Sequence, residues 1–441
     1  MNPASGISDS PKTPREFSIH VIRELREHGH EAYWAGGCVR DLLRGQNPQD
    51  YDVATSALPD QVRQVFGSER TLAVGESFGV MIVRGPRSAG TVEVATFRKD
   101  LEYEDGRRPI GVLYCGARED ALRRDFTING MFYDPVTETV LDYVNGQQDL
   151  AARIVRAIGD PHLRFSEDKL RLLRAARFAA LLEFELEADT AAAVRAMHQQ
   201  IVVVSAERIA QELRKMLASP YRSGAVALLR ELELLKTIFP ELEDWLTRQP
   251  ESYWRDLLRA LQVLSANSFT AAMAVLLRDL PPQPGNPRVS QRTGSASGIC
   301  RRLKLSNSES QEILWAIGSK SQLCQPSTRS LAEVKLLLQS PHFETLFAAE
   351  QAWAIAMNTG LADLDWWTEY RGNSTPEQIN PPLFLTGDDL ITMGLRPGRE
   401  LGRVLEQLRT AQLNEAIQSR EEAVQLLEKL LSPVRPDDAS G

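Results

Sequence analysis

The sequence of 441 residues has no apolar run near the ~18 residues that a membrane-spanning helix requires. Its first residues are rich in Pro and Ser, and they contain no apolar stretch of the kind found in signal peptides. We therefore expect residues 1–14 to be a disordered lead-in. The protein is predicted to be cytoplasmic and to have no membrane partner.

Cysteine and histidine are also scarce. The six histidines show no metal-site spacing, and the four cysteines lie far apart without a CxxC pair: Cys38, Cys115, Cys300 and Cys324. This pattern argues against a structural zinc site and against a disulfide scaffold. We expect the cysteine thiols to be reduced. The histidine spacing gives no indication of a phosphatase or phosphodiesterase activity.

An excess of positive charge is missing as well, since the formal net charge is −8. Phosphate contacts usually need a basic surface, so the overall charge does not indicate a nucleic-acid binder. Arginine is nevertheless concentrated at 153–177, 301–304 and 396–409. These stretches are either local basic surfaces or ordinary solvated helix faces.

The chain is long enough for several domains. Short β-branched segments and turns occupy the region 15–155, which predicts a mixed α/β domain. Beyond it Pro and Gly thin out, and helical patterns dominate three further modules at 156–240, 241–375 and 376–435. Within them, the Pro/Gly/Ser-rich segment 281–298 predicts an exposed loop.

Two motifs in the first domain suggest phosphate and metal chemistry. A predicted strand over 31–37 ends in Gly36-Gly37 and leads into a helix whose N-terminus can face an anion. After twelve intervening residues, Asp50 and Asp52 lie in a predicted strand over 50–55, where alternation puts both carboxylates on one face. Such a pair can hold Mg²⁺ bound to phosphates, although an isolated Asp-x-Asp is also typical of a solvated turn.

A third carboxylate follows at Glu93. In the predicted strand over 91–98, Thr91, Glu93 and Ala95 share the face opposite Val92 and Val94. On a strand beside the Asp pair, Glu93 could accept the proton of an attacking hydroxyl. The alternative is an ordinary outward-facing strand residue.

The order of Gly-Gly, Asp-x-Asp and a later acid resembles the nucleotidyltransferase fold of the DNA polymerase β superfamily. RRDFTING (123–130) resembles the RRDFT-x-N motif of class II tRNA nucleotidyltransferases and bacterial poly(A) polymerases. The segment 167–178, with its Glu-Asp pair and three arginines, resembles their nucleotide-selecting helix. Together these motifs cover about 150 residues in the order of that family.

This resemblance implies an α+β protein: a mixed α/β nucleotidyltransferase head (15–155), then an all-α neck (156–240), body (241–375) and tRNA-binding tail (376–435). Asp50 and Asp52 would bind two Mg²⁺ ions as cofactors, and Glu93 would complete the catalytic set. The residues implied in nucleotide binding are Gly36, Gly37, Arg40, Arg124, Asp125, Asn129, Glu167, Asp168, Arg171, Arg174 and Arg177.

Base selection is assigned by the resemblance to Asp168 and Arg171. Asp168 would accept a hydrogen bond from the exocyclic amine of C or A, and Arg171 would donate to the ring acceptors that these bases share. Periodicity places Arg171, Arg174 and Arg177 opposite the apolar residues of the same helix. An amphipathic helix with a charged solvent face explains that pattern too.

A charged segment between the Glu93 strand and the RRDFT motif resembles the flexible loop that helps the family to switch from C to A. Its residues are Tyr103, Glu104, Asp105, Arg107 and Arg108. The alternative is a charged surface loop without that role.

Within the family, GESFG (75–79) is closer to the tRNA enzymes than to poly(A) polymerases, and the segment 386–398 resembles a tail that docks on tRNA. The alternative for this segment is a helix-turn-helix scaffold that makes no contact with RNA. We predict that the protein uses CTP and ATP to add CCA to the tRNA 3′ end. The alternatives are an A-adding enzyme with a CC-adding partner, a bacterial poly(A) polymerase, and a catalytically silent RNA-binding relative. The sequence makes no prediction of oligomeric state.

Overall fold

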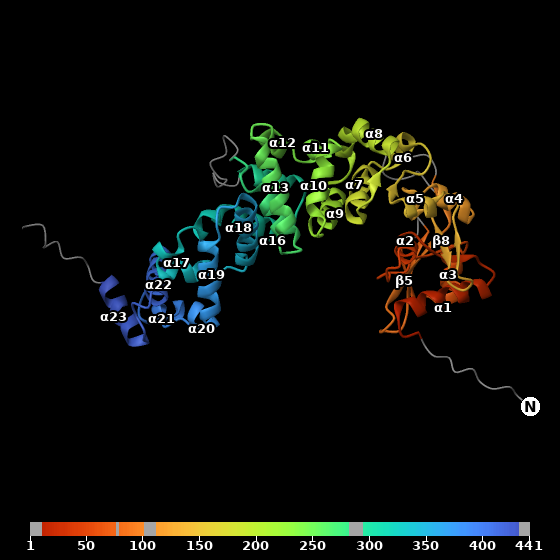
Figure 1. Cartoon of the computed structure of the whole chain (residues 1–441). Coiled ribbons are helices and arrows are strands. Elements are labelled where there is room, and N and C mark those ends of the chain that lie inside the picture. The colour runs from red at the N-terminus through yellow and green to blue at the C-terminus, as the bar shows by residue number, and fades with distance from the viewer. Residues whose placement is uncertain (1–10, 76–78, 101–111, 282–293, 432–441) are drawn as a thin grey trace, which may run out of the picture. The chain divides into compact units, whose positions relative to one another are not determined.

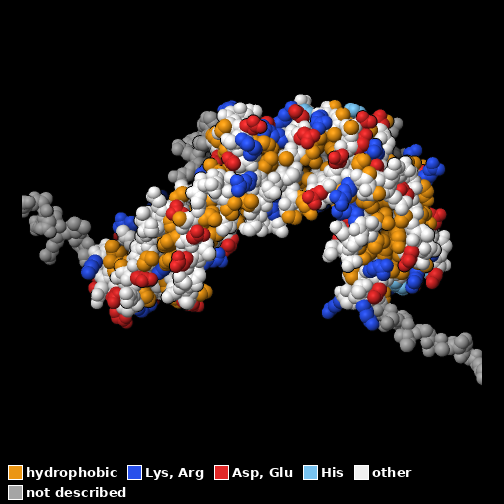
Figure 2. Space-filling model, viewed as in Figure 1, with side chains coloured by type: hydrophobic (Ala, Val, Ile, Leu, Met, Phe, Trp, Pro, Cys, Tyr) orange, Lys and Arg blue, Asp and Glu red, His pale blue; other side chains and the backbone are white. Residues whose placement is uncertain are grey.

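A computed structural model describes residues 11–75, 79–100, 112–281 and 294–431 (Figure 1). The chain divides into two compact units, Met1–Asp244 and Trp245–Gly441. Across the described ranges, no helix is long and apolar enough to cross a membrane. On the face drawn in Figure 2, Lys and Arg side chains are interspersed with Asp and Glu over both units.

The first unit begins with a mixed sheet, as predicted. Among the described residues its strand order is β3-β4-β5-β2-β1-β8-β9, and every neighbouring pair is antiparallel except β2 with β5. The strands are β1 Ala32–Ala35, β2 Val53–Thr55, β3 Thr71–Gly75, β4 Val80–Arg84, β5 Thr91–Thr96, β8 Phe132–Asp134 and β9 Thr139–Leu141. The parallel pair joins the strand after the Asp motif to the strand that carries Glu93.

One face of this sheet packs against helix α1 (Pro14–Glu27). The alternation predicted for β5 is confirmed, because Val92 and Val94 are buried whereas Glu93 is exposed. The indole Nε1 of Trp34 in β1 donates a hydrogen bond of 2.9 Å to Oγ of Ser18, which ties α1 to the sheet. The opposite face of β5 is thereby left for the site.

The remainder of the first unit is mostly helical. Its helices are α2 Gly37–Leu43, α3 Pro59–Phe66, α4 Ala117–Leu122, α5 Gly146–Ala152, α6 Pro161–Glu167, α7 Leu170–Leu182, α8 Ala188–Met197, α9 Ala206–Leu217, α10 Arg222–Glu231 and α11 Leu234–Ile238, with 3-10 turns at Thr127–Asn129 and His198–Val203. Two small sheets add β6 Arg98–Asp100 with β7 Val112–Tyr114, and β10 Ile154–Val155 with β11 Glu185–Leu186. Helix α7 packs on α9 and α10 through buried residues such as Leu172, Leu173 and Leu213.

Helix α12 (Pro240–Leu246) crosses the boundary, and the second unit is helical in its described residues. Its helices are α13 Glu251–Val263, α14 Phe269–Leu277, α15 Gly294–Arg302, α16 Asn307–Ser319, α17 Leu331–Leu338, α18 Phe343–Met357, α19 Ala362–Asn373, α20 Pro376–Ile379, α21 Gly387–Thr392, α22 Arg399–Leu413 and α23 Arg420–Leu431, with 3-10 turns at Lys320–Leu323 and Pro326–Thr328. Trp353 and Trp367 are fully buried and donate to backbone carbonyls. Helices α21, α22 and α23 share a separate apolar cluster that includes Leu390, Val404 and Leu427.

Two sequence predictions are wrong in detail. The predicted loop 281–298 extends too far, because α15 begins at Gly294, while residues 282–293 lie outside the described ranges. Ser295 and Ala296 are buried there, and Oγ of Ser295 donates to the carbonyl of Pro281 (2.6 Å). The strand predicted over 50–55 begins only at Val53, so both aspartates precede it.

Candidate active site

A cleft of about 420 Å³ lies in the first unit, at the ends of β1 and β2. Ten of the residues predicted for catalysis or nucleotide binding line it: Gly36, Gly37, Asp52, Glu93, Arg124, Asp125, Asn129, Asp168, Arg171 and Arg174. Asp50, Arg40, Glu167 and Arg177 do not line it. The predicted loop residues Tyr103, Glu104, Asp105, Arg107 and Arg108 fall outside the described ranges.

Asp52 and Glu93 form the acidic wall of the cleft. Val53 pairs in parallel with Val94, so the preceding residues, Asp52 and Glu93, lie next to each other. The backbone N–H of Ala35 donates to the carbonyl of Asp52 (3.0 Å), which fixes the end of β1 beside this pair. The parallel pairing thus places the two carboxylates as the sequence predicted, although Asp52 lies before the strand.

The pKa of Asp52 is raised to about 6. The first cause is loss of water at the cleft wall, and the negative charges of Glu93 and Asp50 act in the same direction, while Arg124 opposes them. Asp52 is nevertheless exposed to solvent at the cleft wall. The cleft wall therefore carries an excess of negative charge that a bound cation would neutralise.

The donor set fits a hard cation in its chemistry, because carboxylate oxygens are the ligands that Mg²⁺ prefers. The described residues nevertheless contain no group of three or more His, Cys, Asp or Glu side chains arranged to hold a metal. Asp50 is exposed and does not line the cleft, but it is close enough to act on Asp52 electrostatically. Asp52 is thus the best-placed metal ligand of the predicted pair.

The Gly-Gly turn allows Arg124 to approach the end of β1. Gly36 has a φ of +74°, and a Cβ atom there would lie 3.3 Å from Nη1 of Arg124. A side chain at this position would therefore be strained in its backbone and crowded by a guanidinium. Gly36 is required where β1 turns into α2.

Arg124 is held by a residue that the sequence reasoning missed. The buried carboxylate of Asp120 accepts from Arg124 (3.0 Å) and Arg123 (2.9 Å) and from the backbone N–H of Arg98 (3.2 Å). Burial alone would raise the pKa of Asp120, but Arg124 and Arg123 outweigh it and lower that pKa. The spacing of Asp120 four residues before Arg124 on one helical face was the available signal.

Asp125 links the RRDFT motif to α7. Its carboxylate accepts from Nε of Arg174 (2.7 Å) and from Nδ2 of Asn129 (3.2 Å). Burial alone would raise the pKa of Asp125, but Arg174 and Arg171 lower it to about 2. Asn129 also accepts a hydrogen bond from Nη1 of Arg40 (2.8 Å), so Arg40 holds the Asn129 side chain without lining the cleft itself.

The predicted nucleotide-selecting helix is two helices. Helix α6 ends at Glu167, Asp168 has an extended backbone at its C-cap, and α7 begins at Leu170. This break turns Asp168 into the cleft, where its Oδ2 accepts from Nη2 of Arg208 (2.7 Å). The single helix implied for the segment 167–178 is therefore wrong at Asp168.

The arginines of α7 do not present a free solvent face, so the alternative interpretation of an ordinary solvated helix face is wrong. Arg171 is only 8% exposed; it pairs with Glu167 and donates to the carbonyl of Arg123 (3.0 Å). Arg177 donates to Glu212 (2.5 Å), away from the cleft lining. Each guanidinium is therefore held by a partner before any ligand binds.

Arg208, the second missed residue, lies on α9 and lines the cleft. Arg208 and Glu212 are four residues apart and contact Asp168 and Arg177 of the neighbouring segment. Both pairs join residues at least 35 positions apart in sequence, so local patterns do not reveal them. The one local signal was their shared helical face.

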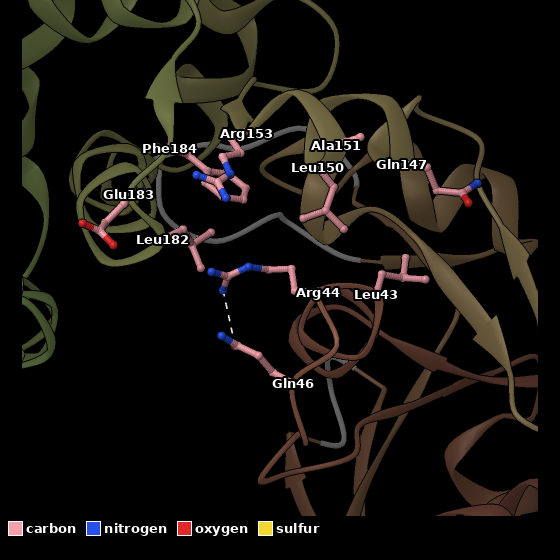
Figure 3. A pocket seen from close by; sticks show the side chains of 10 residues that line it. All are labelled: Leu43, Arg44, Gln46, Gln147, Leu150, Ala151, Arg153, Leu182, Glu183 and Phe184. Atoms are coloured by element: carbon pink, nitrogen blue, oxygen red, sulfur yellow. Dashed lines mark hydrogen bonds between the residues drawn. The ribbon is translucent and has the colours of Figure 1, made fainter.

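A different hollow, shown in Figure 3, lies where α2, α5 and α7 end. Arg44 lies over the ring of Phe184 there and donates to Gln46 (3.4 Å). None of the predicted site residues lines this hollow. We therefore assign the candidate active site to the acidic cleft.

Comparison with known proteins shows the family of the chain. Residues 32–156 match the Poly A polymerase head domain, and residues 183–246 match the probable RNA and SrmB-binding site of polymerase A. Poly(A) polymerase I of Salmonella typhi is 31% identical over 402 residues, covering 84% of this chain and 85% of that protein. The chain belongs to the class II tRNA nucleotidyltransferase and poly(A) polymerase family.

Other members of the family are CCA-adding enzymes. That of Geobacillus thermodenitrificans is 39% identical over 275 residues, which cover 59% of this chain and 67% of that protein. The crystal structure of the Bacillus stearothermophilus CCA-adding enzyme in complex with CTP is 27% identical, with a TM-score of 0.72 over 95% of this chain and 98% of that one. The predicted fold class and the enzyme class, a nucleotidyltransferase, are confirmed.

Proposed function

We propose that this nucleotidyltransferase adds CCA to the 3′ end of tRNA, taking C and A from CTP and ATP without a nucleic-acid template. The observation that carries the proposal is that one cleft combines the acidic pair Asp52 and Glu93 with the candidate base-selecting pair Asp168 and Arg171. An enzyme that selects nucleotides without a nucleic-acid template needs residues for nucleotidyl transfer and residues for base selection in the same cleft.

Asp52, together with Asp50, would hold two Mg²⁺ ions. When bound, these ions would supply positive charge that acidifies the tRNA 3′-hydroxyl and stabilises the pyrophosphate leaving group. Glu93 would accept the hydroxyl proton. The 3′ oxygen then bonds to the α-phosphorus of the NTP as its bond to the pyrophosphate oxygen breaks.

The remaining residues would bind and orient the nucleotide. Arg124 and Arg174 would face the triphosphate and ribose, while Asp120 and Asp125 hold their guanidinium groups in place. Gly36 and Gly37 leave room at the end of β1 for a phosphate to approach the backbone. Preorganised charges of this kind lose little entropy when the substrate binds.

C and A would be chosen by hydrogen-bond pattern. Both bases offer an exocyclic amine, from which Asp168 would accept a hydrogen bond. Both also offer a neighbouring ring nitrogen, to which Arg171 would donate a hydrogen bond. G and U present the reverse arrangement and would leave buried polar groups unpaired. Arg208 fixes the Asp168 carboxylate, and Glu167 fixes the Arg171 guanidinium.

The choice of CCA over A addition or poly(A) synthesis has two supports. CCA-adding enzymes of two Geobacillus species are 39% and 38% identical over 275 residues. In the segment 386–398, Thr386 and Asp389 cap α21, while Gly394 and Gly398 occupy turns with positive φ. We propose that this tail contacts tRNA and that the enzyme works in the cytoplasm.

The test is incubation with Mg²⁺ and tRNA transcripts that end before CCA, after C or after CC, with CTP and ATP supplied separately and together. Completion of all three transcripts is the expected result. Addition of one A to the CC-ended transcript alone would mean an A-adding enzyme. Long A tails would mean a poly(A) polymerase, and no extension would favour the silent RNA-binding relative.

A further inference from the structure

A basic hollow of about 860 Å³ lies in the first unit, between α1 and the ends of β3 and β4. Five basic residues line it: Lys12, His20, Arg23, Arg70 and Arg84. None of the residues of the candidate active site is among its lining residues. It is therefore a separate feature of the head.

The sequence builds this hollow by packing the end of β4 closely on α1. A Cβ atom on Gly85 would lie 2.7 Å from Cε1 of Phe17, so only glycine permits this contact. Phe17 is fully buried, whereas His20 and Arg23, one turn and two turns further along α1, lie at the surface beside it. The helix and the strand end thus form two walls of the same hollow.

Arg70 and Arg84 face each other across the β3 and β4 pair. The N–H of Arg84 donates to the carbonyl of Arg70 (2.8 Å), and Nε of Arg70 donates to the carbonyl of Arg84 (3.2 Å). Like charges directly opposite each other destabilise a strand pair. An anion bound between these side chains would remove that repulsion.

The two carboxylates at this hollow, Glu16 and Glu24, contact Lys12 and His20 rather than the three arginines. Glu16 accepts from the backbone N–H of Lys12 (2.8 Å), and Glu24 lies 3.8 Å from Nδ1 of His20. Within the part of the chain that the structure describes, Arg23, Arg70 and Arg84 have no carboxylate partner. This concentration of unpaired positive charge occurs in a chain with a net charge of −8.

We propose that this hollow binds phosphate groups of the RNA substrate outside the catalytic cleft. Guanidinium groups match the geometry of phosphate oxygens and remain charged at any physiological pH. The ring of Phe17 beneath the hollow is buried, so it offers no face on which a base could stack. The proposed contact is to phosphates of the RNA backbone, which carry no sequence information.

The proposal depends on the proposed function in one respect only, namely that the substrate is an RNA. The full-length triple variant Arg23→Gln, Arg70→Gln, Arg84→Gln tests it, because all three side chains are exposed and their loss leaves the core intact. The matched control is Arg118→Gln, Arg153→Gln, Arg195→Gln, which removes three exposed arginines of the same unit outside the hollow.

Fluorescence anisotropy would measure the dissociation constant for a tRNA transcript that ends before CCA, over a range of salt concentrations. We expect the triple variant to bind about tenfold more weakly at physiological salt, with a slope of log K against log salt reduced by about 2 to 3. The kcat at saturating tRNA should equal that of the control. The wild-type turnover tests the proposed function separately.

Binding and salt dependence equal to those of the control would overturn the RNA contact, as would a lower kcat with unchanged affinity. A free polyphosphate is the other source of the same chemistry. Tripolyphosphate binding is therefore measured in an Asp52→Ala background, with and without the three substitutions. Loss of tripolyphosphate binding without loss of tRNA binding would assign the hollow to small polyphosphates and overturn the RNA contact.

Discussion

Arg208 should control base discrimination although the sequence motifs do not include it. Its guanidinium donates to both oxygens of Asp168, at 3.2 and 2.7 Å, and both side chains are mostly buried. Hydrogen bonds to charged groups contribute about 1.5 to 3 kcal/mol, which corresponds to roughly a tenfold to hundredfold effect. Arg208→Ala should therefore lower the preference for CTP and ATP over UTP and GTP by about that factor.

The assay is kcat/KM for single-nucleotide addition with each of the four triphosphates. Asp168→Ala should relax discrimination as well, and the double variant should be no worse than Asp168→Ala alone, because the two residues act as one unit. Arg208→Lys should restore part of the preference. If Arg208→Ala retained full discrimination while Asp168→Ala lost it, the positioning role of Arg208 would be refuted.

Three further changes follow from the contacts around the cleft. Gly36→Ala should lower the free energy of unfolding measured with urea by about 1 kcal/mol or more and should lower nucleotide incorporation. The backbone at this position has a φ of +74°, and the added methyl group would crowd Arg124; an unchanged free energy of unfolding would contradict this strain. Burial raises the pKa of Cys38 to about 11, so iodoacetamide at pH 8 should modify exposed Cys324 and leave Cys38 unmodified until the protein is unfolded, and equal labelling would contradict this. Because Arg174 and Arg171 lower the pKa of buried Asp125 to about 2, its ionised form should stabilise the fold by roughly 2 kcal/mol at neutral pH. That stability should disappear as pH falls from about 4 to about 2, and the difference from Asp125→Asn should disappear with it; a difference independent of pH would refute the assignment.

Local patterns predicted the parts of the site that are set by one element. The alternation of Val92 and Val94 with Glu93 predicted which face Glu93 occupies, and the structure agrees. The Gly-Gly pair after a short strand predicted a tight turn, and Gly36 has the positive φ that such a turn requires. These features depend on neighbours within a few residues.

Long-range contacts explain what the sequence could not predict. The strand after the Asp motif begins at Val53 because its register with both β1 and β5 covers residues 53–55, although the carbonyl of Asp52 still accepts from Ala35 of β1. The ion pair of Asp168 with Arg208 joins residues 40 positions apart. Helical periodicity placed Arg171 opposite the apolar residues of its helix, but it could not show that the carbonyl of Arg123 and the carboxylate of Glu167 hold Arg171 in a buried position.

The central claim is that transfer takes place at the acidic cleft. It is tested most directly by measuring single-turnover CTP incorporation and tRNA affinity side by side for Asp52→Ala and for Glu183→Gln, an exposed substitution in the hollow of Figure 3. We expect Asp52→Ala to abolish incorporation while tRNA affinity stays near that of the wild type, and Glu183→Gln to change neither. Incorporation retained by Asp52→Ala would contradict the assignment of the cleft and of its metal ligand.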